Sequence, residues 1–168
     1  MDERYRYSID IPCPVGVWTV VSAGAAVIGI YLAKHKNRPD FPSNLPADRI
    51  CKQAAIQIEE YFAGDRDQFD LPLAPMGTEF EKRVWNALLE IPFGTTWSYG
   101  QLARYIGSPK AARAVGAANG RNPISLVIPC HRVIGSSGKH VGYGGGLPVK
   151  AWLLAHEGAE CGATVAVS

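Results

Sequence analysis

Residues 98–120 hold the pattern that most restricts the fold of this chain: two short helices joined by a tight turn. The segment Ser98-Tyr99-Gly100-Gln101 is a capping box and predicts a helix over residues 98–106. The pair Ser108-Pro109 predicts a second helix over residues 110–119, with the serine as its N-cap and the proline in its first turn. Two short helices with a glycine-containing turn between them are typical of a helix-turn-helix unit.

The second of these helices has an unusual surface for an element that reads DNA. Side chains that read bases in the major groove are long and polar, whereas this helix offers Ala112, Ala114 and Ala117 around one long cation, Arg113. Small side chains allow the close approach that the minor groove requires, and a single arginine could enter the duplex. The same alanines would also suit packing against neighbouring helices, and the pattern alone leaves both interpretations open.

The first part of the chain has a different pattern, in which most of the predicted elements are strands. Alternating and β-branched runs predict strands at residues 4–9, 17–21 and 26–32, and a one-sided apolar stripe predicts a helix at residues 47–63. Two prolines in residues 65–76 indicate a linker. We therefore expect an α/β domain, a small antiparallel sheet plus a helix, over residues 1–76.

Two more helices complete the second part. A capping box at Thr78-Glu79-Phe80-Glu81 predicts a helix that continues to Ile91, and residues 149–157 predict a last helix that ends at a glycine. With the helix-turn-helix they make a mainly α, winged-helix-like domain over residues 77–160. We expect residues 161–168 to be a tail.

Charge and cysteine usage limit the classes of function. The net charge is only +2, but lysines and arginines are concentrated between residues 110 and 150, and no acidic residue lies between Glu90 and Glu157. This local excess suits a nucleic-acid partner. The four cysteines are widely spaced with no Cys-x-x-Cys, which argues against a disulfide framework or a zinc cluster, so we expect no metal and no cofactor. The first residues lack a signal-peptide core, and we expect a cytoplasmic protein.

One apolar stretch, residues 15–33, has about the length of a membrane span. Glycines and serine interrupt it, and Ser22-Ala23-Gly24 divides it into two β-rich runs. A β-hairpin explains this pattern better than a transmembrane helix. We expect no contact with a membrane.

The candidate for chemistry is the adjacent pair Cys130-His131, which follows an apolar run and a proline. A thiol needs to become a thiolate before it is a good nucleophile, and a histidine is a suitable base. On the pair alone, a buried structural cysteine is the more common interpretation. We interpret the other such residues, Cys13 and His35, as incidental rather than as ligands.

Several separate motifs, taken together, closely resemble the O6-alkylguanine-DNA alkyltransferases, which are also called methylated-DNA–protein-cysteine methyltransferases. The motifs occur in the order and spacing of that family, and they are Ser98-Tyr99-Gly100-Gln101-Leu102-Ala103, Ala111-Ala112-Arg113-Ala114-Val115-Gly116, Asn122-Pro123, Ile128-Pro129-Cys130-His131-Arg132-Val133 and Leu153-Leu154-Ala155-His156-Glu157-Gly158. The resemblance covers about residues 77–158. The N-terminal half resembles the family loosely, as a ribonuclease-H-like unit.

The resemblance implies direct reversal of DNA damage. An alkyl group on O6 of guanine, and also on O4 of thymine, would move irreversibly to Cys130 after the base is flipped out of the duplex from the minor-groove side. His131 would deprotonate the thiol through a water molecule, Glu157 would orient His131, and Tyr99 would assist flipping and protonate the leaving base. The partner would be double-stranded DNA with an alkylated guanine, and the protein would act as a monomer without an obligate protein partner.

Further roles also follow from the resemblance alone. Arg113 would fill the vacated stack, and the alanines beside it would line the DNA. Asn122 would brace the turn before the active site. Val133 would accept from the guanine amino group together with the Cys130 carbonyl, while Tyr143 and Gly144 would line the alkyl pocket.

The sequence departs from the family pattern at Gly144, where many members have a serine. This change is expected to remove a side-chain contact to the base and to widen the pocket. There is also no counterpart for the zinc ligands of some relatives. Two other functions remain open: a non-catalytic lesion binder or helix-turn-helix regulator, whose relatives lack the cysteine, and a cysteine hydrolase using Cys130 and His131.

Overall fold

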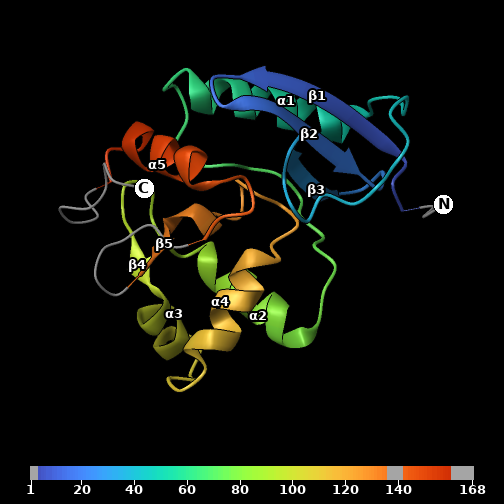
Figure 1. Cartoon of the computed structure of the whole chain (residues 1–168). Coiled ribbons are helices and arrows are strands. Elements are labelled where there is room, and N and C mark those ends of the chain that lie inside the picture. The colour runs from blue at the N-terminus through green and yellow to red at the C-terminus, as the bar shows by residue number, and fades with distance from the viewer. Residues whose placement is uncertain (1–3, 136–141, 160–168) are drawn as a thin grey trace.

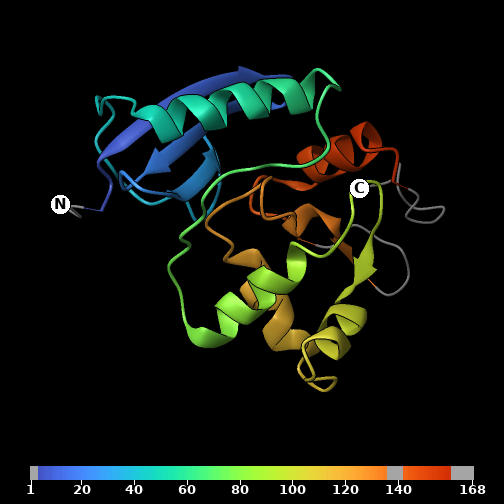
Figure 2. The same cartoon turned by 180° about the vertical axis from the view of Figure 1, so that it is seen from behind.

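The computed structural model describes residues 4–135 and 142–159 of the chain. The N-terminal part is a three-stranded antiparallel sheet in the order β1-β2-β3, formed by β1 (Tyr7–Cys13), β2 (Gly16–Ser22) and β3 (Val27–Leu32). The helix α1 (Arg49–Phe62) lies across one face of this sheet (Figures 1 and 2). Its buried side is apolar and includes Ile50, Ala54 and Ile58, which pack in the core. The expected α/β N-terminal fold is confirmed.

The first strand lies further along the chain than predicted. Its prediction at residues 4–9 is wrong in extent, because β1 continues to Cys13 and includes Pro12, which pairs with Val17. Proline cannot donate to a strand ladder, but β1 is the outer strand of the sheet, and an edge strand tolerates it. The hairpin closes at Gly16, whose φ of 129° is strongly unfavourable for other residues.

The outer edge of β3 joins the two parts of the chain. Residues that we predicted to be a linker pair with it, since the Val27 amide donates to the Pro72 carbonyl at 2.8 Å. Further along the same edge, the Ile30 amide donates to the Pro123 carbonyl at 2.9 Å and the Ser125 amide donates to the Ile30 carbonyl at 3.1 Å. The segment that leads to Cys130 is therefore hydrogen-bonded directly to the N-terminal sheet.

The C-terminal part is mainly helical, as expected. Its elements are α2 (Glu79–Leu88), β4 (Trp97–Ser98), α3 (Tyr99–Tyr105), α4 (Ala112–Gly120), the 3₁₀ turn η1 (Cys130–Arg132), β5 (Val133–Ile134) and α5 (Leu147–His156). Both predicted capping boxes are confirmed, at Thr78 with Glu81 and at Ser98 with Gln101. β4 and β5 pair in parallel, which sets the start of α3 beside the residues that follow Cys130.

The predicted start of α4 is wrong. Ser108 does not cap this helix and belongs to the end of α3 instead, where its amide donates to the Ala103 carbonyl at 2.9 Å. Pro109 and the residue after it form a turn, and α4 begins at Ala112 without a side-chain cap. The helix pair of the helix-turn-helix is nevertheless present, as Figure 1 shows.

Two ends of helices also differ from the prediction. α2 ends at Leu88 rather than Ile91, and α5 begins at Leu147, two residues earlier than expected, with Pro148 in its first turn. The predicted tail, residues 161–168, lies outside the described residues. Within the described part of the chain no helix has both the length and the apolar character to cross a bilayer, and the apolar stretch at residues 15–33 forms β2 and β3.

Candidate active site

Cys130 begins the turn η1 in the interior of the protein, with only 5% of its surface exposed. Burial raises the pKa of its thiol, while a hydrogen bond from Asn122 and the nearby Lys150 ammonium act in the opposite direction. The net shift is upward, so the resting side chain is a neutral thiol. It needs a base before it can act as a nucleophile.

His131 and Glu157 form a buried pair next to this thiol. Nε2 of His131 lies 2.8 Å from Oε2 of Glu157, and both side chains are fully buried. Burial lowers the pKa of His131 in spite of the carboxylate, so the ring is neutral at pH 7. With its Nε2 proton directed at Glu157, the ring offers its Nδ1 lone pair to a proton donor, and among the described residues Nδ1 has no hydrogen-bond partner.

Glu157 is held from three directions. Arg132 donates from Nε to one carboxylate oxygen at 2.8 Å and from Nη2 to the other at 3.1 Å, and the Tyr61 hydroxyl donates to Oε2 at 2.7 Å. Burial alone would raise the pKa of Glu157, but His131 and Arg132 outweigh it and hold that pKa well below its usual range. The carboxylate is therefore ionised and fixed in orientation.

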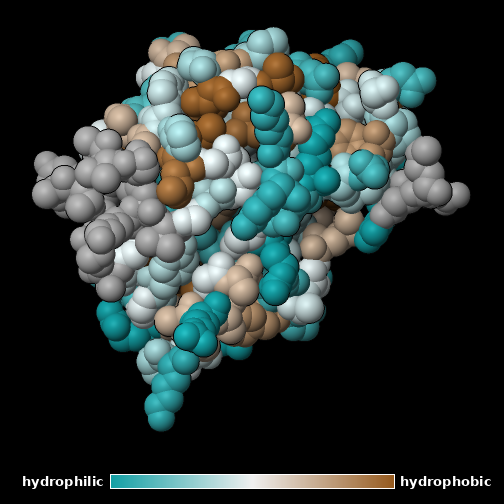
Figure 3. All heavy atoms as spheres, viewed as in Figure 1, coloured by the Kyte–Doolittle hydropathy of each residue, from teal (hydrophilic) through white to brown (hydrophobic). Residues whose placement is uncertain are grey.

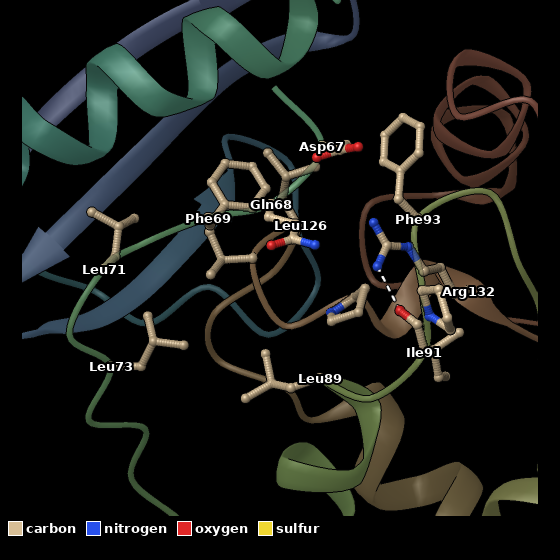
Figure 4. Close-up of a pocket in the computed structure, with 13 residues that line it drawn as sticks. Asp67, Gln68, Phe69, Leu71, Leu73, Leu89, Ile91, Phe93, Leu126 and Arg132 are labelled. Atoms are coloured by element: carbon tan, nitrogen blue, oxygen red, sulfur yellow. Dashed lines mark hydrogen bonds between the residues drawn. The ribbon is translucent and has the colours of Figure 1, made fainter. Parts of the chain in front are cut away.

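Arg132 is itself anchored on the C-terminal part. Its Nη1 donates to the carbonyl of Ile91 at 2.8 Å, and its guanidinium lies 5.8 Å from the centre of the Phe93 ring. Figure 4 shows these contacts at one side of a cavity of about 470 Å³, whose other side is formed by linker residues such as Phe69 and Leu71. Cys130 does not line this larger cavity.

A smaller pocket of about 100 Å³ lies over the thiol. It brings together residues that are far apart in the sequence: His35, Lys36, Tyr99, Gly116, Asn119, Gly120, Asn122, Cys130, Gly142, Tyr143 and Gly144. Tyr99, Tyr143 and Gly144 were all predicted here from the resemblance. His35, which we interpret from the sequence as incidental rather than as a ligand, also lines this pocket.

Tyr99 is the first residue of α3 and packs against α4. The ring lies directly beside Gly116, where a Cβ atom would make an ordinary van der Waals contact with it at 3.6 Å. Burial raises the pKa of Tyr99, and its hydroxyl remains a proton donor at neutral pH. The side chain is only half-buried, which leaves it open to the pocket.

Asn122 braces the turn that precedes Cys130. Its Oδ1 accepts from the Ile124 amide at 3.0 Å, and its Nδ2 donates to the Ile128 carbonyl at 2.8 Å. Between them Leu126 has a φ of 75°, which is unfavourable for a branched side chain. Side-chain bonds from Asn122 thus help to hold a strained turn in place.

The outer face of α4 carries the residues that we expected to meet DNA. Arg113, Ala114 and Ala117 are exposed, and Ala112 is half-buried, while Val115 and Ala118 pack inward. Over this helix the surface is white to tan and is bordered by hydrophilic side chains (Figure 3). Ala114 and Ala117 are therefore not part of the hydrophobic core.

Comparisons with known proteins agree over both parts of the chain. Residues 79–159 match the family described as "6-O-methylguanine DNA methyltransferase, DNA binding domain", and residues 5–75 match its "ribonuclease-like domain". The chain belongs to the 6-O-methylguanine DNA methyltransferase family. One relative is the methylated-DNA–protein-cysteine methyltransferase of Methanosarcina acetivorans, which is 47% identical over 86% of this chain and 94% of the relative. Another is the methylated-DNA–protein-cysteine methyltransferase of Mycobacterium leprae, which is 45% identical over 84% of this chain and 86% of the relative.

Solved structures of family members share the fold. The crystal structure of Mycobacterium tuberculosis O6-methylguanine methyltransferase has a TM-score of 0.81 and 42% identity, with 96% of this chain and 98% of that chain covered. The M. tuberculosis OGT in complex with DNA has a TM-score of 0.80 and 44% identity, with 90% and 91% covered. The two-part architecture is thus that of the family.

Two of the carbonyls expected to recognise guanine already have partners within the protein. The Val133 carbonyl accepts from Nζ of the buried Lys150 at 2.6 Å, and the Cys130 carbonyl accepts from Nδ2 of Asn119 at 3.3 Å. The Cys130 carbonyl also accepts from the Val133 amide, so both of its lone pairs have partners within the protein. The hydroxyl of Tyr143 is buried without a hydrogen-bond partner in the described structure, and it lies in the same pocket.

The expectation that Gly144 widens the pocket is wrong. A Cβ atom on Gly144 would collide with Nε2 and Cε1 of His35. The imidazole of His35 thus fills the space that a side chain at this position would occupy. Because His35 comes from the loop after β3, sequence patterns within the C-terminal part could not reveal it.

Tyr61, Arg132 and Lys150 were also missed as parts of the site. In the sequence, Lys150 stands out only as one of several positive charges, Arg132 as a positive charge within the motif around Cys130, and Tyr61 as part of an apolar helix face. Their partners are 17 to 96 residues away in the sequence, so no local spacing predicts the contacts. In the described ranges no group of three or more His, Cys, Asp or Glu side chains is arranged to hold a metal ion.

We predict that Tyr61→Phe destabilises the protein by about 1.5–3 kcal/mol, because it removes a buried hydrogen bond to an ionised carboxylate. Urea unfolding of the purified variant measures this loss directly. Tyr105→Phe is the matched control, since Tyr105 is 56% exposed. Equal unfolding midpoints for the two variants would contradict the role of Tyr61 as a partner of Glu157.

Proposed function

We propose that this protein repairs alkylated DNA by moving the alkyl group from O6 of guanine to Sγ of Cys130, in a single irreversible turnover. One observation carries the proposal: a neutral thiol lies buried beside a His131–Glu157 pair, at the base of a small pocket flanked by α4. Family membership supports the same reaction. O4-alkylthymine carries its alkyl group on a comparable exocyclic oxygen and is proposed as a second substrate.

The chemistry begins with activation of the thiol. The Cys130 proton passes through a water molecule to Nδ1 of His131, and Glu157 stabilises the imidazolium that results. The thiolate then attacks the alkyl carbon, so that the S–C bond forms as the C–O6 bond breaks and the electron pair stays on the base. Tyr99 donates a hydrogen bond to the leaving guanine and assists its protonation.

The base has to leave the duplex before this reaction, because the alkyl group of a stacked base is out of reach. The outer face of α4 carries small alanine side chains, which suit entry into the minor groove, where Arg113 fills the space that the extruded base leaves. Contacts of this kind are nearly independent of sequence, which suits a search for rare lesions. The complex of the M. tuberculosis relative with DNA supports double-stranded DNA as the partner.

The thioether on Cys130 is chemically stable, and the protein therefore acts once. A nucleophilic thiol also needs a reducing compartment, and Cys13, Cys51 and Cys130 are free. We accordingly assign the protein to the cytoplasm, as a monomer without an obligate protein partner, and divide it into domains at residues 1–76 and 77–160. None of the proposed steps requires a cofactor.

A stoichiometric titration tests this function. Increasing amounts of a duplex with one O6-methylguanine are mixed with a fixed amount of protein, and the repaired lesions are counted. We expect repair to stop at one lesion per chain. Turnover of many molecules would indicate a hydrolase, and tight binding with no repair would indicate a lesion-binding protein.

We also predict that Arg113→Ala slows transfer from a duplex by about tenfold or more, because unstacking a base costs a few kcal/mol that Arg113 would offset. Transfer from single-stranded DNA should change much less. Arg104→Ala, which removes an equal charge from an exposed site on α3, is the control for simple electrostatics. An equal effect of Arg113→Ala on both substrates would contradict the role in flipping.

A further inference from the structure

We propose that His35, from the N-terminal part of the chain, binds the extruded base by donating a hydrogen bond from Nε2 to the edge that carries O6 and N7. This inference rests on the proposed function and adds a recognition residue to it. It also means that the N-terminal part contributes a residue that contacts the extruded base.

The loop that carries His35 is fastened to the C-terminal part on both sides of the ring. The Lys36 amide donates to the Gly144 carbonyl at 3.1 Å, and Nδ2 of Asn37 donates to the Gly120 carbonyl at 2.7 Å. The His35 amide also closes a turn onto the Leu32 carbonyl at 3.0 Å. The imidazole is 7% exposed and is thus held in position at the pocket wall.

The proton of the ring is placed by a backbone contact. The Asn37 amide donates to Nδ1 of His35 at 3.1 Å, so Nδ1 is an acceptor and a neutral ring carries its proton on Nε2. Burial lowers the pKa of His35, with the nearby Lys36 acting in the same direction, and the ring is therefore neutral at pH 7. Nε2 is the ring atom nearest to the position that a Cβ on Gly144 would take.

The contact with Gly144 suggests that the ring of His35 takes the place of a side-chain donor at position 144. The ring of His35 fills the volume that a side chain at position 144 would occupy. O6 and N7 are the two acceptors on this edge of guanine. An N–H donor from His35 therefore takes the place of a donor that the glycine cannot supply.

The same hydrogen bond should favour the transfer step. As the C–O6 bond breaks, the electron pair left on the base makes O6 a much stronger acceptor than it is in the alkylated ether. A fixed donor near this oxygen stabilises the transition state more than the bound substrate. His35 keeps its proton throughout, so its role is hydrogen bonding and not general acid catalysis.

The test is a reciprocal exchange measured by single-turnover transfer from an O6-methylguanine duplex. His35→Ala should lower the maximal transfer rate by about tenfold, with a smaller effect on DNA affinity. His35→Gln retains an N–H donor and should lose less. Gly144→Ser alone should also slow transfer, because its Cβ collides with the ring of His35, whereas the double variant His35→Ala/Gly144→Ser should be faster than either single variant.

Lys34→Ala is the control, since Lys34 is exposed on the same loop and does not line the pocket. Unfolding midpoints of all variants separate a loss of the site from a loss of the fold. If the unchanged protein transfers methyl groups and His35→Ala does so at the same rate, or the double variant is slower than both single variants, the inference about His35 is overturned and the proposed function stands. If the unchanged protein transfers nothing, the proposed function itself fails.

Discussion

Cys130→Ala is expected to abolish methyl transfer while leaving the affinity for DNA unchanged. The alanine removes the sulfur atom that is proposed to accept the alkyl group, and the outer face of α4 remains intact. Because the side chain is buried, the loss of a sulfur atom should cost only about 1–3 kcal/mol of stability. Transfer of a radiolabelled methyl group and a binding titration with the same duplex measure the two properties separately.

Cys13→Ala is the matched control for this variant. Cys13 is also a free thiol, but it lies in the β1–β2 hairpin, where its Sγ donates to the Gly16 carbonyl at 3.0 Å. This control should transfer at the wild-type rate. Residual labelling of the Cys130→Ala protein, on Cys13 or any other residue, would show that the acceptor has been assigned incorrectly.

Glu157→Gln has the second largest expected effect. The amide cannot stabilise an imidazolium on His131, and the change leaves the buried guanidinium of Arg132 without its counter-charge. Transfer should slow by about 10²- to 10⁴-fold, and breaking the buried ion pair should cost about 3–5 kcal/mol of stability. Single-turnover kinetics and urea unfolding test the two consequences.

The dependence of stability on pH gives this variant a distinctive signature. The pKa of Glu157 is lowered in the folded protein, so its stabilising effect is fully present above its ordinary pKa of about 4.5 and is lost as the pH falls through the lowered value. The stability difference between wild type and Glu157→Gln should therefore be largest at neutral pH and should shrink in acid. A difference that stays constant down to pH 3 would contradict an ionised Glu157.

Local signals in the sequence predicted much of the fold. The capping boxes at Thr78 and Ser98 located two helix starts to the residue, because a cap depends on side chains within three positions of each other. The prediction for Ser108 is wrong because α4 begins only at Ala112, and the Ser108 amide closes the end of α3. Residue types alone do not show to which of two neighbouring helices such a residue belongs.

The site was predictable only in part. The motif around Cys130 and the position of Glu157 predicted the pairing of His131 with Glu157, since these residues lie in the family's own pattern. His35 and Tyr61 come from the N-terminal part, and their contacts depend on how β3 and α1 dock against the C-terminal helices. Such contacts arise from tertiary packing, so neither residue type nor spacing along the chain reveals them.

The docking between the two parts also changes the role of the N-terminal part. Backbone hydrogen bonds along the edge of β3, the Tyr61–Glu157 contact and the ring of His35 all connect it to the active site. We therefore expect a truncated chain that begins at residue 77 to be less stable and slower in transfer than the full chain. Expression of this fragment and a single-turnover assay measure the difference.

The intact mass of the protein after reaction with an O6-methylguanine duplex tests alkyl transfer to Cys130 directly. We expect a gain of one methyl group per chain, about 14 Da from the replacement of a hydrogen atom by CH₃, and peptide mapping should locate it on Cys130. An unchanged mass with the lesion still present, or a methyl group on another residue, would contradict it.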